Sequence, residues 1–401
     1  MSQLFPFRAL RPAPATAARV ASVPYDVVNT EEARALAAKE PLSFLRVTRS
    51  EVDLPADTNP YDDRVYAQAV TNFTALKAAA PMVTDDAPSL YFYRLTMGAH
   101  VQIGLAGCFS VDEYDRGLIK KHEKTRKDKE DDRTRHITEL RAQTGVVFLT
   151  YRESADVNAI ANRVVAGAPL YRFTANDQIS HELWRVTGAD AAALVAAFAK
   201  LPALYIADGH HRAASASRAQ TALKGSGESK TFIAVAFPDT QMLILPYNRV
   251  VKDLAGQTPD QFLSALKARV KVSPGSPVPP KAGTVSMFFG GAWHFIELPR
   301  AAPGTPRDES LDVAVLQSAV LEPVLKVGDP RSDKRIDFVG GARGTAELEK
   351  LVTSGKAAVA FSLVPTTIDD LMTIADAGGI MPPKSTWFEP KLRDGLLVHV
   401  I

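Results

Sequence analysis

Helical periodicity is clearest in three stretches of the chain. Residues 30–39 begin with Thr30 followed by two glutamates, which is typical of a helix N-terminus. Residues 61–80 carry apolar side chains at helical spacing, and residues 212–223 are rich in alanine. We therefore predict a helix in each of these three stretches.

Strand-like patterns lie between these helices. Residues 89–97 and 101–111 alternate between apolar and polar positions on either side of a short turn that contains glycine, which predicts a β-hairpin. Short apolar runs at 146–151 and 203–207 predict buried strands. Because strands and helices interleave along the chain, the pattern favours a mixed α/β (α+β) fold.

A proline-rich segment, PGSPVPPKAG at 274–283, is the strongest linker signal. We predict that it separates a larger unit, 1–273, from a smaller C-terminal α/β unit, 274–401. A hairpin over 284–298 and a helix over 311–325 are expected in the second unit. The length of 401 residues is consistent with more than one domain.

Composition and charge narrow the class of protein. Hydrophobic residues make up 46% and charged residues 23%, which is typical of a globular protein. The balance of 47 basic against 45 acidic residues argues against a nucleic-acid-binding protein that relies on bulk positive charge. The single cysteine, Cys108, cannot close an intrachain disulfide. With no apolar signal region or membrane-length apolar run, we expect a cytoplasmic protein.

The sharpest polar motif is Asp208-Gly209-His210-His211-Arg212, between a short apolar strand and an alanine-rich helix. Glycine permits the tight turn, and the first N–H groups of the helix favour an anion. Arg212 could add a planar fork, and the two histidines could donate further hydrogen bonds. Asp208 could hold Mg²⁺ or accept a proton. We interpret the motif as a phosphate-binding turn; the alternative is a structural turn whose histidines cap the helix.

A second polar cluster occupies residues 120–141, with nine Lys/Arg and six Asp/Glu. On a helix these charges would form i,i+4 pairs, so a solvated surface helix is the simplest interpretation. The histidines and the mixture of charges also suit one wall of a polar cleft. The candidate ligands in this cluster are Lys120, Lys121, His122, Arg126, Arg133 and His136. A zinc site made from His122, His136, His210 and His211 has no supporting spacing.

Two weaker polar sites remain. Pro24-Tyr25-Asp26 is a turn that presents an acid, and the glycine-rich loop 340–344 lies beyond the charged run Asp333-Lys334-Arg335. Backbone amides in such a loop can bind an anion, although an ordinary turn explains the same residues.

Several long stretches resemble the bacterial family known as domain of unknown function 1015. They are FPFRALRP near the start, SVPYDVV at 22–28, IKKHEKTRKDKEDDRTRH at 119–136, LYIADGHHRAASA at 204–216, LPYNRVVKDL at 245–254 and MPPKSTWFEPKLRDGLLVH at 381–399. The resemblance covers nearly the whole chain and names no activity.

The DGHHR turn is also similar to the nucleotide-phosphate loop of the ParB/sulfiredoxin-like superfamily, which includes ADP-dependent free-serine kinases, ATP-using sulfiredoxin and CTP-binding ParB. The resemblance implies a ParB/sulfiredoxin-like core with a mixed sheet, in which residues 209–212 hold the terminal phosphates of ATP or ADP. It implies Mg²⁺-assisted phosphoryl transfer to a small hydroxyl compound such as serine. The catalytic candidates are Asp208, His210, Asp26 and Glu123.

Two alternatives use the same phosphate clamp. One is a ParB-like regulator that binds nucleotide without turnover, and the other is a phosphohydrolase with water as the acceptor. No membrane partner is expected, nucleic acid is not favoured because no helix-turn-helix pattern is present, and a homodimer is compatible with the sequence.

Overall fold

The computed structural model describes residues 2–401, and the chain forms two compact units. Unit 1 runs to Met242 and includes Pro390–Ile401, whereas unit 2 is Leu243–Glu389. This division differs from the predicted units 1–273 and 274–401. The proline-rich segment 274–283 connects β15 to β16 within unit 2, so it is an internal loop and not a linker.

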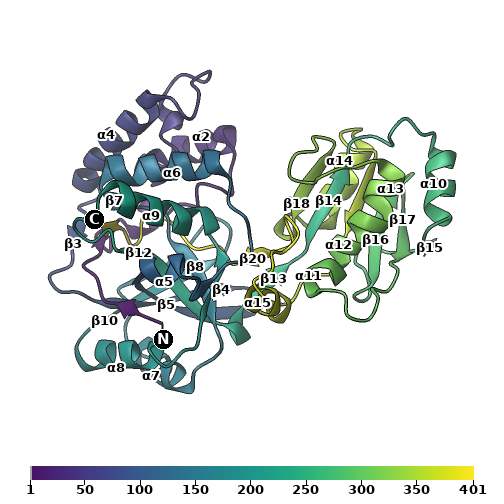
Figure 1. Ribbon diagram of the computed structural model, residues 1–401. Coiled ribbons are helices and arrows are strands. Elements are labelled where there is room, and N and C mark those ends of the chain that lie inside the picture. Colours follow the sequence, from purple (N-terminus) through teal and green to yellow (C-terminus); the bar gives the residue numbers. More distant parts are fainter. Residues whose placement is uncertain (1) are drawn as a thin grey trace. The chain divides into compact units, whose positions relative to one another are not determined.

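A nine-stranded mixed sheet forms the core of unit 1 (Figure 1). The strand order is β6-β11-β8-β12-β5-β4-β10-β9, with β1 paired to β5. The pairs β6–β11 and β8–β12 are parallel and the others are antiparallel. Its strands are β1 Leu4–Phe5, β4 Leu90–Met97, β5 His100–Ser110, β6 Ile119–Lys120, β8 Val147–Tyr151, β9 Tyr171–Thr174, β10 Ser180–Val186, β11 Leu204–Asp208 and β12 Thr231–Pro238. The predicted hairpin and the two predicted buried strands are confirmed.

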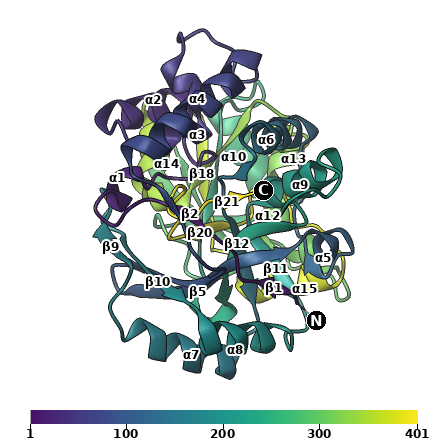
Figure 2. The same ribbon diagram turned by 90° about the vertical axis from the view of Figure 1, so that its left-hand side faces the viewer.

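Helices cover both faces of this sheet, which confirms the mixed α/β class. In Figures 1 and 2, α7 (Ala155–Val165) and α8 (Gly188–Phe198) lie below the sheet, and α9 (His210–Ala222) lies above it. Helices α5 (Val111–Asp115) and α6 (Lys127–Leu140) pack against α9. The side chains between the helices and the sheet are apolar and nearly inaccessible to water, and their burial stabilises the fold.

Smaller elements complete unit 1. They are α1 Ala17–Val20, α2 Thr30–Lys39, α3 Leu45–Thr48, η1 Ser50–Asp53, α4 Asp63–Ala79 and η2 Asp239–Gln241, with two small sheets made of β2 Leu10–Arg11 with β3 Val83–Thr84 and of β7 Ala142–Gln143 with β21 His399–Val400. The C-terminal segment forms backbone β-bridges with the N-terminal segment, since Val398 pairs with Leu10 and Asp394 pairs with Ser22. These backbone bonds explain why residues 390–401 belong to unit 1.

Unit 2 contains a six-stranded antiparallel sheet in the order β15-β17-β16-β19-β14-β18, with β13 and β20 paired separately. Its strands are β13 Leu243–Leu245, β14 Tyr247–Val251, β15 Lys271–Pro274, β16 Thr284–Phe289, β17 Ala292–Glu297, β18 Ile336–Gly340, β19 Val359–Ser362 and β20 Trp387–Glu389. Its helices are α10 Pro259–Lys267, α11 Arg307–Ser310, α12 Asp312–Leu316, η3 Gln317–Leu321, α13 Glu322–Leu325, η4 Gly341–Arg343, α14 Gly344–Thr353 and α15 Ile368–Asp376.

Two predictions for unit 2 have different outcomes. The hairpin expected over 284–298 is confirmed as β16 and β17. The helix expected over 311–325 is interrupted by a π-helical turn at Gln317–Leu321. Pro323 follows this turn and has no N–H to donate, so it cannot make the α-helical hydrogen bond to the carbonyl oxygen of Ala319. Across residues 2–401, no helix is both long enough and apolar enough to cross a bilayer.

Candidate functional site

The DGHHR motif forms the predicted strand–turn–helix. Strand β11 ends at Asp208 with an irregular register against β8, and α9 begins at His210. Gly209 has a φ of 93°, a left-handed backbone conformation that glycine adopts without the strain that a side chain would cause. The N-cap residue, Gly209, has no side chain to cap α9. The N–H groups of Arg212 and Ala213 donate to the carbonyl oxygen of Gly209, and the first turn of the helix forms the positive end of its dipole.

The loop 121–126 lies beside this turn because of how the sheet is connected. Strand β6 is the parallel neighbour of β11, and parallel strands place their carboxyl ends at the same edge of a sheet. The backbone N–H of His122 donates to Nε2 of His210 at 3.3 Å, and the N–H of Arg126 donates to Nε2 of His211 at 3.0 Å. Both histidines of the motif thus hold the charged loop.

These contacts give the two histidines a role different from the one expected. An Nε2 that accepts an N–H is unprotonated, so each neutral ring carries its proton on Nδ1. Burial, together with the neighbouring His122, lowers the pKa of His210 well below its usual value. Nδ1 of His210 lies 3.7 Å from the Oε2 of Glu123, which brings this candidate base to the turn.

His122 is the third histidine at the turn. Its ring packs edge-on against His210, with 4.4 Å between the ring centroids, and burial lowers the pKa of His122 to about 4. Its Nδ1 is buried and has no hydrogen-bond partner in the described chain. His122 and His210 are therefore neutral at physiological pH.

Arg212 faces Asp26 and not the open end of the turn. Its Nη2 lies 2.7 Å from both carboxylate oxygens of Asp26, and its Nη1 donates to the carbonyl oxygen of Val146 at 2.7 Å. The Arg212 side chain is only 6% exposed, whereas that of Asp26 is 36% exposed. The Arg212 guanidinium, which we expected to bind phosphate, instead binds the carboxylate of Asp26, which remains partly exposed to solvent.

Asp208 forms an ion pair that the sequence did not indicate. Nζ of Lys391 lies 2.8 Å from Oδ2 of Asp208, and the Lys391 side chain is largely buried. Burial by itself would raise the pKa of Asp208, but Lys391 and Arg212 outweigh it and lower this pKa well below its usual range. An ammonium group therefore lies beside the first turn of α9. Lys391 lies in the stretch 381–399, and no spacing in the sequence indicates that it lies beside the turn.

The basic side chains of the loop point to several partners. Nζ of Lys121 lies 3.6 Å from the ring centroid of Tyr114, and the guanidinium of Arg126 pairs with Asp128. Lys120 is at the end of β6, the strand next to β11. Of the predicted phosphate ligands in this loop, Lys121 and Arg126 thus have side-chain partners outside the turn.

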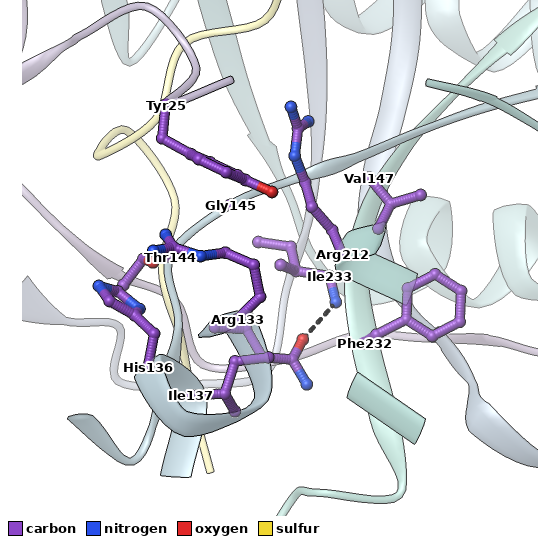
Figure 3. A pocket seen from close by; sticks show the side chains of 11 residues that line it. Tyr25, Arg133, His136, Ile137, Thr144, Gly145, Val147, Arg212, Phe232 and Ile233 are labelled. Atoms are coloured by element: carbon purple, nitrogen blue, oxygen red, sulfur yellow. Dashed lines mark hydrogen bonds between the residues drawn. The ribbon is translucent and has the colours of Figure 1, made fainter. Parts of the chain in front are cut away.

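Arg133 and His136 project from α6 on the far side of Tyr25 from Arg212. Arg133 pairs with Asp132 and lies 4.3 Å from the ring centroid of Tyr25, while Arg212 lies 5.6 Å from it (Figure 3). His136 donates from Nε2 to the carbonyl oxygen of Val47, and burial lowers its pKa to about 4. Both predicted ligands are thereby committed to the packing of α6.

A small cavity lies among these side chains. It encloses about 20 Å³ and is lined in part by Tyr25, Arg133, Thr144 and Arg212 (Figure 3). This volume accommodates one water molecule. The cavity is therefore too small to hold a nucleotide, the ligand predicted from the sequence.

The buried carboxyl of Asp394 lies in the same cluster. Its Oδ2 has no hydrogen-bond partner among the described residues. Burial raises the pKa of Asp394 to about 7; Arg212 and Arg133 oppose this shift, whereas Asp26 adds to it. The folded state consequently binds more protons at this site than the unfolded chain between about pH 4 and 7, and stability falls as the pH rises through that window.

Replacing Asp394 with asparagine should remove the loss of stability that ionisation of this buried carboxyl causes at high pH. We expect Asp394→Asn to be more stable than the wild type by about 2 kcal/mol at pH 8, with the gain much reduced at pH 5. Urea unfolding at the two pH values measures the difference. An identical pH dependence in both proteins would contradict the assignment.

The structure does not form the four-histidine zinc site. Among residues 2–401, no group of three or more His, Cys, Asp or Glu side chains could hold a metal ion. Mg²⁺ makes smaller demands, because it is commonly held by one or two carboxylates together with nucleotide phosphates. Asp208 fits such a single-carboxylate role, provided that Lys391 releases it.

A family model identifies the chain's relatives. The family described as "Protein of unknown function (DUF1015)" matches residues 4–316, which is more than half of the chain. The chain belongs to this family. The predicted family is thus confirmed, and the DUF1015 match includes the DGHHR turn, loop 121–126 and Asp26 but ends before Lys391. No curated protein matches the chain.

Several solved structures resemble this DUF1015 protein. A conserved hypothetical protein from Pyrococcus furiosus is 15% identical, with 74% of this chain and 95% of that chain covered and a TM-score of 0.37. Truncated SbnI from Staphylococcus aureus is 13% identical, with 74% and 87% covered and a TM-score of 0.42. A free serine kinase in complex with AMP is 14% identical, with 73% and 91% covered and a TM-score of 0.36. Because these scores are below 0.5, we interpret the site from this chain's own residues.

Proposed function

We propose that the protein binds a Mg²⁺–nucleotide, ATP or ADP, at the start of α9 and transfers a phosphoryl group to a small hydroxyl compound. The observation that carries this proposal is the Asp208–Lys391 ion pair beside the N-terminus of α9. An ammonium group and the positive end of a helix dipole attract phosphate oxygens, and the adjacent carboxylate suits the accompanying cation.

In this proposal, nucleotide binding replaces the Asp208–Lys391 ion pair with two new contacts, one for each side chain. Lys391 would turn from Asp208 to a phosphate oxygen, and Asp208 would become a ligand of the nucleotide's Mg²⁺. Phosphoryl transfer depends mainly on positioning and charge neutralisation, and the Lys391 ammonium and the α9 amides supply both. The chemistry that Mg²⁺ would supply is neutralisation of phosphate charge.

Asp26 is the proposed general base. Arg212 holds its carboxylate through one nitrogen, and the side chain remains exposed enough to contact an acceptor hydroxyl. A carboxylate has lone pairs for a second hydrogen bond while it accepts from an arginine. Glu123, beside His210, is the second candidate for the same role.

Phosphorus NMR tests the proposal directly. The purified protein is incubated with Mg²⁺ and either ATP or ADP, with and without serine and related hydroxyl compounds. Turnover that requires an acceptor supports a kinase, and turnover without one supports a phosphohydrolase. The absence of nucleotide binding would rule out the kinase, the phosphohydrolase and the nucleotide-responsive regulator.

Asp26→Asn provides the matching mutational test. The amide cannot accept a proton, so we expect the turnover rate to fall by about 10²- to 10⁴-fold while nucleotide affinity changes little. Asp57→Asn, at an exposed position outside the cluster, serves as the control and should retain full activity. Turnover unaffected by Asp26→Asn would transfer the role of base to Glu123.

A nucleotide-responsive regulator is the second candidate. It is favoured by the bonds from loop 121–126 to His210 and His211, because a ligand at the turn would alter the anchoring of this charged loop. Binding without turnover, together with changed proteolytic sensitivity of the loop, would support this function over catalysis.

A further inference from the structure

Unit 2 contains a buried arginine on an inner strand of its sheet. Arg249 is on β14, where its backbone pairs with Phe338 of β18 on one side and Phe361 of β19 on the other. Directly paired residues project to the same face of a sheet, so the guanidinium lies among aromatic side chains. Arg249 is only 3% exposed.

The hydrogen-bond partners of Arg249 are all neutral. Its Nη1 donates to the carbonyl oxygen of Tyr247, and its Nη2 donates to that of Pro383 at 3.2 Å. Within residues 2–401, Arg249 forms no ion pair with a carboxylate. Burial accordingly lowers the pKa of Arg249 to about 9, and only Tyr247 opposes the shift.

The other buried arginines show that this arrangement is unusual within the molecule. Arg212 pairs with Asp26, and Arg393 pairs with Asp177. Burial of an unpaired charge is strongly unfavourable, so a guanidinium retained in such a place calls for a negative partner. For Arg249 the folded chain does not supply one.

The segment 383–387, which contains Pro383, packs closely against the sheet beside Arg249. A Cβ on Gly340 would lie 2.7 Å from the indole ring of Trp387, which shows how closely the segment approaches β18. Lys384 adopts a left-handed conformation, with a φ of 58°, and its Nζ lies 5.4 Å from the ring centroid of Tyr247. A second positive charge is thereby held near the residue whose carbonyl oxygen binds Arg249.

From these contacts we infer that Arg249 and Lys384 form an oxyanion-binding site in unit 2, which takes the carboxylate or phosphate group of a small metabolite. The remaining N–H groups of the planar guanidinium match two oxygens of such a group, and Lys384 adds a single charged donor. This site is separate from the proposed nucleotide site and does not depend on it.

Anion-dependent thermal stability of the full-length protein tests the inference. Sodium phosphate and sodium acetate are titrated separately to low-millimolar concentrations, with sodium chloride at matched ionic strength as the reference. All proteins carry Lys391→Met, so that phosphate at the nucleotide site does not contribute. We expect phosphate or acetate to raise the Tm by about 5 °C when Arg249 is present, and the effective anion identifies the chemical class.

Arg249→Met should abolish this response. It should also leave the Tm in chloride at least as high as before, because methionine removes an unpaired buried charge. Arg300→Met, at an exposed position of unit 2, should keep the full response. If Arg249→Met does not fold, Arg249→Lys provides the comparison and should retain part of the response.

Two outcomes would overturn the inference. One is that neither anion raises the Tm beyond chloride when Arg249 is present. The other is an equal anion response with and without the Arg249 guanidinium, which would make Arg249 a clamp for the carbonyl oxygens of Tyr247 and Pro383 only. Since Lys391 is absent throughout, failure here is distinguishable from failure of the nucleotide proposal.

Discussion

Replacement of Lys391 with methionine is expected to weaken nucleotide binding by about 10- to 100-fold. Nζ of Lys391 lies within hydrogen-bond distance of Asp208, beside the start of α9. A hydrogen bond to a charged group contributes about 1.5–3 kcal/mol, which corresponds to that range of affinity. Isothermal titration calorimetry with Mg²⁺ and ATP or ADP measures the change.

A matched variant separates this effect from a general loss of positive charge. Lys200→Met removes a lysine that is 71% exposed and paired with Asp156 on the surface, so it should bind nucleotide as the wild type does. Equal affinity in Lys391→Met and Lys200→Met would remove Lys391 from the phosphate site. The Asp208–Lys391 pair would then be a structural tie between the C-terminal segment and β11.

The second large effect is expected for stability. Arg212→Met should reduce the free energy of unfolding by about 3 kcal/mol, because it deprives Asp26 and the carbonyl oxygen of Val146 of their shared partner. This loss of free energy is at the low end of the range for breaking a buried ion pair, because Asp26 is partly exposed. Urea unfolding followed by circular dichroism measures the loss.

Arg163→Met is the control for this prediction. Arg163 also pairs with an aspartate, Asp190, but its side chain is 60% exposed, and such surface pairs contribute less than about 1 kcal/mol. A double-mutant cycle with Asp26→Asn should show coupling, because Arg212 and Asp26 are in direct contact. A loss for Arg212→Met no larger than for Arg163→Met would contradict the anchoring role.

Local patterns were sufficient wherever an element depends on its own residues. The hairpin of β4 and β5 follows from alternation around a turn, and α9 follows from glycine at its N-cap and a run of helix-forming residues. The helix over 311–325 was only partly predicted, since helical spacing does not show that Pro323 disrupts regular hydrogen bonding.

The partners within the site could not be read from local patterns. Asp26 and Arg212 are 186 residues apart, and Lys391 and Asp208 are 183 residues apart. The roles of the two histidines depend on the parallel pairing of β6 with β11, which brings loop 121–126 to the turn. No periodicity encodes which strands become neighbours in a sheet.

By itself, the sequence determined the mixed α/β class, the family, and a sharp strand–turn–helix that presents helix amides, because each depends on short-range backbone preference or on a continuous motif. Only the tertiary structure decided that Arg212 faces Asp26, that Lys391 returns to Asp208, and that Arg249 is buried without a carboxylate. The physical reason is that charge pairing and burial are set by which distant segments pack together, and a guanidinium has the same side chain whether it meets a carboxylate, a carbonyl oxygen or a ligand.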